Sequence, residues 1–169
     1  MTLLARHLAW WRSKVRQFAT YVRARVSDPE RAALAEWLTA AQLQLFDTMH
    51  VADRRHGLDV VAALRAEGVR DPDVLLAGLL HDCGKGNTGV VARVVYSVGQ
   101  SYGRSIRRAA SVIPGLRSEL DRLTVHAETS ARLANDAGCT PRTVELIRNQ
   151  DEPRDVEYGM LLKMADEAN

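Results

Sequence analysis

Apolar residues recur at intervals of three and four positions along most of the chain, and no clear alternating strand pattern interrupts them. The first stretch shows this at steps of 4, 3, 4, 3 and 4, through Leu4, Leu8, Trp11, Val15, Phe18 and Val22. Such spacing places the apolar side chains on one face of a helix. The sequence therefore predicts an all-α fold.

Prolines, glycines and capping residues divide this pattern into about seven or eight helices. Asp28-Pro29, Asp71-Pro72 and Thr140-Pro141 each combine a cap with proline at the first helical position. After a first helix within 1–27, the predicted helices cover about 28–49, 51–67, 71–82, 90–111 (interrupted near Gly99 and Gly103), 116–137, 141–150 and 155–167. With 169 residues the chain fits a single-domain helical bundle over 28–169, with 1–27 as a basic amphipathic appendage.

Charge is unevenly distributed, although 23 Lys and Arg against 21 Asp and Glu leave a formal net charge of only +2. Residues 1–27 contain six basic residues and no acid, and residues 86–118 contain five arginines and no acid. The segments between and after them carry net charges of −4 (28–85) and −5 (119–169). The two acid-free blocks are the parts expected to meet an anionic partner or water.

Each acid-free block has two interpretations. The first helix is compatible with an anionic membrane surface, or with packing against the core or a partner subunit, including a homo-oligomer contact. The arginines of the second block either attract phosphates near a site or form a solvated face; they are Arg93, Arg104, Arg107, Arg108 and Arg117. No nucleic-acid-binding module is recognised in either block.

Gross features favour a cytoplasmic protein. The sequence contains no run of 18 apolar residues, which a transmembrane helix would need. The apolar core of a signal peptide is also not expected near the N-terminus, because basic residues interrupt it at Arg6, Arg12, Lys14 and Arg16. The two cysteines, Cys83 and Cys139, are 56 positions apart and form no paired metal or redox motif. Reduced thiols in a reducing compartment are the simplest interpretation.

The strongest chemical signal is the pair His81-Asp82 at the end of the apolar run 75–80. An imidazole and a carboxylate need polar partners when they are buried, and a divalent metal ion would supply one for both. Adjacent positions on a helix differ by about 100°, so both side chains can reach the same ion. Lys85, four residues after His81, lies on a similar face, where its ammonium can bind a phosphate oxygen.

Two further residues fit this pattern. His126 falls in the middle of the predicted helix 116–137, and Asp166 ends the run 161–166, where the apolar stripe predicts an interior position.

The order of these residues resembles that of the HD superfamily of metal-dependent phosphohydrolases, over about residues 46–167. The segment 79–85, Leu-Leu-His-Asp-Cys-Gly-Lys, is similar to the central signature of that family, and Ala165-Asp166 is similar to its closing signature. The resemblance implies an HD-type helical domain in which one divalent metal ion is ligated by His56, His81, Asp82 and Asp166. Imidazole and carboxylate ligands suit Mn, Fe, Co, Ni or Zn, and Mg is a further candidate.

His126 matches a position where some members of the family use an additional histidine for a second metal. The next such histidine would be expected near Arg148, but the chain has Asn149 and Gln150 there, which argues against a full binuclear site. His126 is then a substrate contact, a proton donor to the leaving group or a partial second-metal ligand.

The resemblance implies hydrolysis of a nucleotide or another small phosphorylated metabolite by metal-activated water. In that scheme Asp82 orients the water, while Lys85 and His126 complete the catalytic set. A second hypothesis is a degenerate HD module that binds a nucleotide or a protein partner without turnover, at a membrane surface. Its motivation is Asn149-Gln150 together with the basic first helix.

Overall fold

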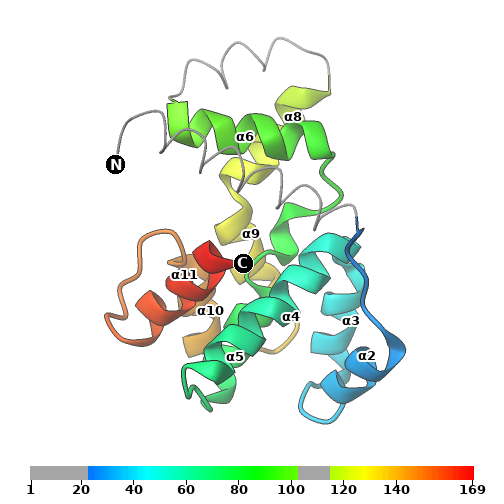
Figure 1. The fold of residues 1–169 in the computed structure, drawn as a ribbon, viewed down its shortest axis with the longest axis vertical. Coiled ribbons are helices and arrows are strands. Elements are labelled where there is room, and N and C mark those ends of the chain that lie inside the picture. Colours follow the sequence, from blue (N-terminus) through cyan, green and yellow to red (C-terminus); the bar gives the residue numbers. More distant parts are fainter. Residues whose placement is uncertain (1–22, 103–114) are drawn as a thin grey trace.

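The structure, a computed structural model, describes residues 23–102 and 115–169. This part of the chain contains nine α-helices, one short 3₁₀-helix and no strand, which confirms the all-α prediction (Figure 1). The elements are α2 (Asp28–Leu34), α3 (Ala40–Thr48), α4 (Val51–Ala66), α5 (Pro72–Leu80), η1 (Cys83–Lys85), α6 (Val90–Tyr102), α8 (Leu116–Thr124), α9 (His126–Asp136), α10 (Pro141–Arg148) and α11 (Tyr158–Ala168). Most of the predicted first helix (1–22) and three of the predicted phosphate-attracting arginines, Arg104, Arg107 and Arg108, lie outside the described residues.

The single helix predicted over 28–49 is wrong, because the chain forms two helices there. α2 ends at Leu34 and α3 begins at Ala40. Between them Thr39 and Gln42 form a capping box, in which each side chain accepts a hydrogen bond from the other residue's backbone N–H. These bonds satisfy donors that a new helix start leaves free, so the break is stable.

The helix predicted over 116–137 is also two helices, which meet at Val125. At the end of α8 the hydroxyl of Thr124 donates to the carbonyl of Leu120 (2.8 Å), and Nδ1 of His126 bonds the carbonyl of Leu123 (2.7 Å). Side-chain hydrogen bonds thus satisfy backbone carbonyls at the end of α8. His126 consequently opens α9 and does not lie in the middle of a helix.

The remaining helices follow the predictions closely. α4, α5 and α10 lie within two residues of the predicted bounds, and α6 passes through Gly99 without a break. α11 begins at Tyr158 and not near 155, because a carboxylate oxygen of Asp155 accepts hydrogen bonds from the backbone N–H groups of Glu157 and Tyr158. The two split helices raise the number of described helices above the seven or eight predicted.

The main hydrophobic core lies among α3, α4, α5, α9, α10 and α11. Its fully buried side chains include Phe46, Val60, Leu64, Leu79, Leu80 and Ile147. α4 and α5 cross closely at Gly57, where an added Cβ would lie 2.5 Å from the carbonyl oxygen of Leu79. This close crossing brings His56, next to Gly57, towards the end of α5.

A second, smaller core joins α6 and α8, which lie together above the rest of the bundle in Figure 1. It is built from Ala92, Leu116, Leu120 and Leu123, with Val95 and Tyr96 packed against them. Residues 86–89 connect Lys85 to the start of this α6–α8 unit, and Val125 alone connects its end to His126. Both residues therefore lie at the junction of the two cores.

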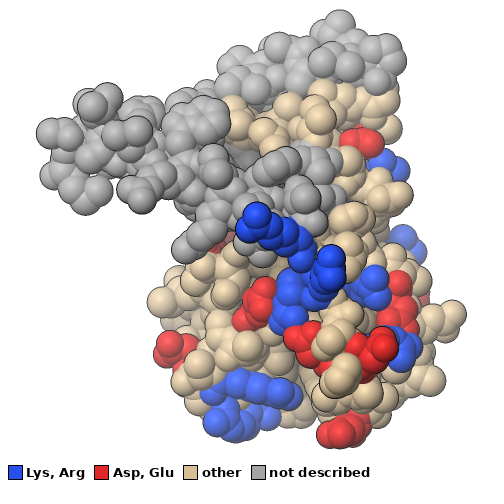
Figure 2. Space-filling view, turned by 45° about the vertical axis from the view of Figure 1, so that its right-hand side comes forward, with Lys and Arg blue, Asp and Glu red and all other residues tan. Residues whose placement is uncertain are grey.

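Basic and acidic side chains are interspersed on the face of the molecule shown in Figure 2. Ion pairs account for part of this pattern, since Arg31 contacts Asp47, and Arg55 contacts both Glu30 and Asp59. Among the described residues no helix is both long and apolar enough to cross a membrane.

Candidate metal centre

Three helices bring His56, His81 and Asp166 together. His56 lies in α4, His81 caps the end of α5, and Asp166 lies in the last turns of α11. Nε2 of His56 is 2.8 Å from Oδ1 of Asp166, and Nε2 of His81 is 3.4 Å from the same oxygen. One donor atom from each residue lies within 4.8 Å of the others, so this group can hold a metal ion.

His81 presents an unsatisfied nitrogen to this group. Its side chain is only 2% exposed, and Nδ1 bonds the carbonyl of Gly78 at 2.9 Å. That bond assigns the proton of a neutral ring to Nδ1 and leaves a lone pair on Nε2. Nε2 is buried and has no hydrogen-bond partner, which is costly unless a cation or a proton occupies it. The geometry of His81 thus fits a metal ligand.

Asp82 lies beside this group with its two oxygens turned to different neighbours. Oδ2 is 3.5 Å from Nε2 of His81, 4.0 Å from Nε2 of His56 and 2.5 Å from the ammonium nitrogen of Lys85. Oδ1 is 3.7 Å from Nε2 of His126. The carboxylate, also 2% exposed, therefore connects the histidine pair with Lys85 and His126.

The electrostatics of the cluster favour charged side chains in spite of burial. Burial opposes ionisation of Asp82 and Asp166, but neighbouring imidazoles, and for Asp82 also Lys85, hold the pKa of each well below its usual range. Burial would likewise lower the pKa of His81, but the carboxylates of Asp82 and Asp166 outweigh it and raise that pKa to about 9. The pKa of Lys85 is raised for the same reason, by Asp82 and Asp53 against burial.

His126 is held at the edge of the cluster by the packing of η1 against α9. The backbone N–H of Gly84 donates to the hydroxyl of Ser130 at 2.8 Å. A Cβ at Gly84 would lie 2.5 Å from both the carbonyl oxygen of His126 and the backbone nitrogen of Ser130. Only glycine allows this approach, which places Asp82 and His126 side by side.

Gln150 contributes to the site in a way that the sequence did not suggest. Its side chain is buried, and its amide donates to the backbone carbonyl of His81 at 3.2 Å. Asn149, in contrast, donates to the backbone and side chain of Glu145. The end of α5 needs donors for its last carbonyls, but no sequence signal connects positions 69 residues apart.

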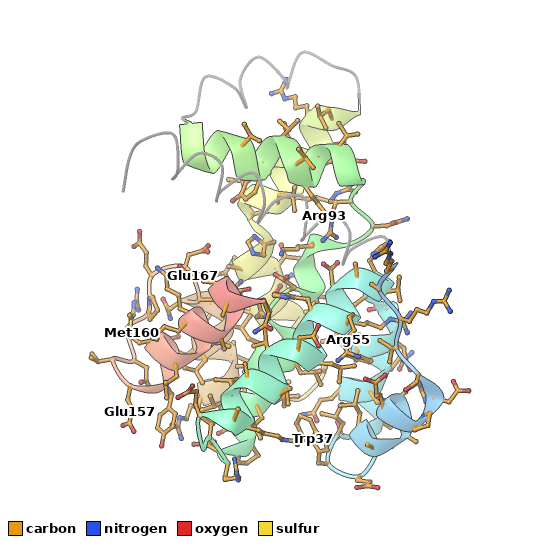
Figure 3. The ribbon with its side chains drawn as sticks, viewed as in Figure 1. Trp37, Arg55, Arg93, Glu157, Met160 and Glu167 are labelled. Atoms are coloured by element: carbon orange, nitrogen blue, oxygen red, sulfur yellow. The ribbon has the colours of Figure 1, made fainter. Side chains whose placement is uncertain are left out.

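Asp53 and Arg93 form a second contact that the sequence did not suggest. Asp53 lies one helical turn before His56 in α4, and the guanidinium of Arg93 donates to both of its oxygens, at 2.5 and 2.7 Å. Figure 3 labels Arg93, at the start of α6. This ion pair ties α6 to α4, and it engages one of the arginines predicted to attract phosphates. Another of them, Arg117, is exposed on α8.

The cluster is buried on one side and exposed to solvent on the other. The side chains of His81 and Asp82 are 2% exposed, whereas that of Asp166 is 41% exposed. Two imidazoles and a carboxylate are typical ligands of divalent first-row metals, and an exposed side leaves room for a further ligand. The structure places all the predicted site residues in this one cluster: His56, His81, Asp82, Lys85, His126 and Asp166.

Comparisons of the chain with protein-family models, with curated proteins and with solved structures give no match. Its function is therefore inferred from the residues of the cluster and their geometry.

Proposed function

We propose that this protein is a metal-dependent phosphohydrolase of the HD type. It would cleave a phosphate ester bond of a nucleotide or another small phosphorylated metabolite. The observation that carries the proposal is the convergence of His56, His81 and Asp166, whose donor atoms lie within 4.8 Å of one another beside a buried Asp82. The order of these residues along the chain, as in the HD superfamily, supports it.

The metal ligands would be His56, His81, Asp82 and Asp166. A divalent ion held by them acidifies water and polarises a phosphoryl oxygen. Its identity is drawn from Mn, Fe, Co, Ni, Zn and Mg, with the imidazoles favouring the transition metals.

The other residues would act on the substrate directly. Lys85 can bind a phosphate oxygen and stabilise the charge that grows on it during the reaction, because its ammonium lies against Asp82 at the edge of the ligand group. Nδ1 of His126 is engaged by the carbonyl of Leu123, so Nε2 is the ring atom that faces the site. When the ring also carries a second proton, on Nε2, that proton can pass to the leaving oxygen. Asp82 keeps Nε2 of His126 oriented and can accept a hydrogen bond from the attacking water.

The state of the cysteines bears on the compartment in which the reaction would take place. Cys83 and Cys139 are both free and buried, which suits a reducing compartment, and we place the activity in the cytoplasm. A membrane or homo-oligomer contact through residues 1–27 is a separate hypothesis, which flotation of the full-length chain with anionic liposomes and light scattering would test.

A second function, ligand binding without turnover, is favoured by one observation. The side chains of Asn149 and Gln150 are engaged by Glu145 and by the carbonyl of His81, so neither offers a ligand for a second metal. A degenerate HD module of this kind would bind a nucleotide or a partner protein and release no product.

Elemental analysis of the purified protein and a phosphate-release assay test the proposal. The assay would use nucleoside mono-, di- and triphosphates and a phosphodiester, with each candidate metal added. Asp82→Asn should abolish phosphate release, whereas Asp136→Asn, an exposed carboxylate on α9, should not change it. A wild-type chain that binds nucleotide and metal but never releases product would favour the second function. A chain that binds no divalent metal would contradict the first.

A further inference from the structure

Lys85 occupies the oxygen of Asp82 that a metal ion would need. Its ammonium nitrogen lies 2.5 Å from Oδ2 of Asp82, and Oδ2 is the oxygen that faces Nε2 of both His81 and His56. We infer that Lys85 is an internal counter-cation that competes with the metal ion for Asp82 and so sets the metal affinity of the site. This inference rests on the proposed function, because it takes the histidine pair as metal ligands.

The contact between Lys85 and Asp82 is built into the local backbone. Asp82 is the N-cap of η1 and Lys85 is its last residue, and the backbone N–H of Lys85 donates to the carbonyl of Asp82 at 3.0 Å. Gly84, between them, is fixed against α9 by its hydrogen bond to Ser130. The backbone of Lys85 is therefore held close to Asp82, and its side chain can place the ammonium either on Asp82 or in the space next to it.

The two oxygens of Asp82 are not equivalent for a cation. Oδ1 is the oxygen in contact with His126, at 3.7 Å from Nε2, whereas Oδ2 is the one in contact with Nε2 of His56 and His81. A cation placed between Nε2 of His56 and Nε2 of His81 would reach Asp82 at Oδ2, where it meets the ammonium. Two cations on one oxygen repel each other strongly in a buried site, so binding of the metal favours displacement of the ammonium.

Displacement gives Lys85 a second role in the same place. Once it leaves Oδ2, the ammonium is free to bind an anion beside the metal, and a phosphate oxygen is the anion that the proposed reaction supplies. Metal binding and presentation of Lys85 to the substrate would then be one event. A residue that only supported the metal ligands would behave differently, because its removal would weaken metal binding.

Removal of the ammonium separates these two possibilities by the sign of the effect. Isothermal titration with Mn²⁺ or Co²⁺ would compare the wild-type chain with Lys85→Met and Lys163→Met. Lys163 lies in α11, one turn before Asp166, and its ammonium donates to the backbone carbonyl of Asp151. It controls for the loss of a positive charge near the site. We expect Lys85→Met to bind the metal at least about tenfold more tightly, which corresponds to about 1.4 kcal/mol, and Lys163→Met to match the wild type.

Chemical labelling of the unmodified chain gives a second readout that does not depend on a variant. The sequence has only three lysines, Lys14, Lys85 and Lys163, so mass spectrometry can follow acetylation of each one. The rate at Lys85 should rise severalfold when metal is added, because its ammonium leaves Asp82, while the rate at Lys163 should stay constant. An unchanged rate at Lys85 would overturn the inference.

The outcomes also distinguish this inference from the proposed function. Metal binding by the wild type with equal or weaker binding by Lys85→Met would overturn the inference and leave the metal site intact. A wild-type chain that binds no metal would overturn both.

Discussion

Nε2 of His56 and Oδ1 of Asp166 lie 2.8 Å apart, although 110 positions separate the two residues in the sequence. The same oxygen is 3.4 Å from Nε2 of His81. Asp166 therefore joins the last helix of the chain to α4 and to the end of α5 through one carboxylate oxygen. The cluster therefore depends on the packing of α4, α5 and α11 against one another.

Asp166→Asn should remove most of the metal affinity, because an amide is a much poorer ligand for a divalent ion than a carboxylate. We expect the dissociation constant for Mn²⁺ or Co²⁺ to rise by at least about 100-fold, or about 2.7 kcal/mol. Isothermal titration measures this change. Asp136→Asn, which alters a carboxylate exposed on α9, should leave the affinity unchanged, and equal affinity in both variants would contradict the assignment of Asp166.

The stability of the chelator-treated protein should fall as pH rises above neutrality. His81 has a pKa of about 9 in the folded state against an ordinary value of 6.5, so the folded state holds its proton more tightly than the unfolded state. That contribution is complete below pH 6.5 and is lost as pH rises towards 9; it amounts to at most about 3 kcal/mol. Urea unfolding in the presence of EDTA across this range measures it.

Metal ions should reverse this trend, because a metal can replace the proton on His81. Added Mn²⁺ should therefore raise the unfolding midpoint more at pH 8 than at pH 6. On the acid side the lowered pKa values of Asp82 and Asp166 predict a loss of stability as pH falls below about 3.8, where the unfolded carboxylates take up protons.

The alkaline part of the same urea measurement tests His81. If the stability of the chelator-treated protein did not change between pH 6.5 and 9, His81 would not be held by these two carboxylates.

Gly84→Ala should destabilise the protein, because a Cβ there would lie 2.5 Å from backbone atoms of His126 and Ser130. We expect a loss of about 2–3 kcal/mol in the free energy of unfolding. Gly89→Ala is the matched control, since its nearest neighbour, at 3.3 Å, is the side-chain carboxylate of Glu119, which can move. Its cost should stay below about 1 kcal/mol, and similar costs for both variants would argue against tight packing of η1 on α9.

Gln150→Met keeps the size of the side chain and removes the donor that bonds the His81 carbonyl. The unpaired buried carbonyl should cost about 1–3 kcal/mol of stability. Because the backbone of His81 is then less firmly held, metal affinity should also fall, by about tenfold. Asn149→Ala is the control, since it loses only the contacts to Glu145 near the end of α10. Equal metal affinities in the two variants would show that Gln150 has no effect on His81.

Local sequence signals were sufficient to predict the positions of most helices. They failed at the two places where side-chain hydrogen bonds divide a continuous apolar pattern into two helices. Asp71-Pro72 and Thr140-Pro141 fix the starts of α5 and α10, because a cap followed by proline has few alternatives. The breaks before α3 and at Val125 depend on side-chain hydrogen bonds inside a continuous apolar pattern. Spacing of apolar residues does not reveal such bonds, so the sequence predicted one helix in each place.

The candidate ligands were recognisable from the sequence because polar residues stand out in apolar stripes. His81-Asp82 follows six almost wholly apolar positions, and Asp166 ends a similar run. Two buried contacts in and near the cluster were not recognisable. Gln150 and Asp53 have ordinary helical surroundings in the sequence, and only packing brings Gln150 to the carbonyl of His81 and Arg93 to Asp53.

By itself the sequence determined that this chain is helical, where most of its helices begin, and which side chains are available to bind a metal. Those properties depend on neighbours within one or two helical turns. The tertiary structure alone decided that the carboxylate of Asp166 contacts both histidines and that Gln150 donates to the carbonyl of His81. It also decided that Lys85 contacts Oδ2 of Asp82. These contacts depend on how closely the helices pack at positions such as Gly57 and Gly84, and that distance is not encoded in local spacing.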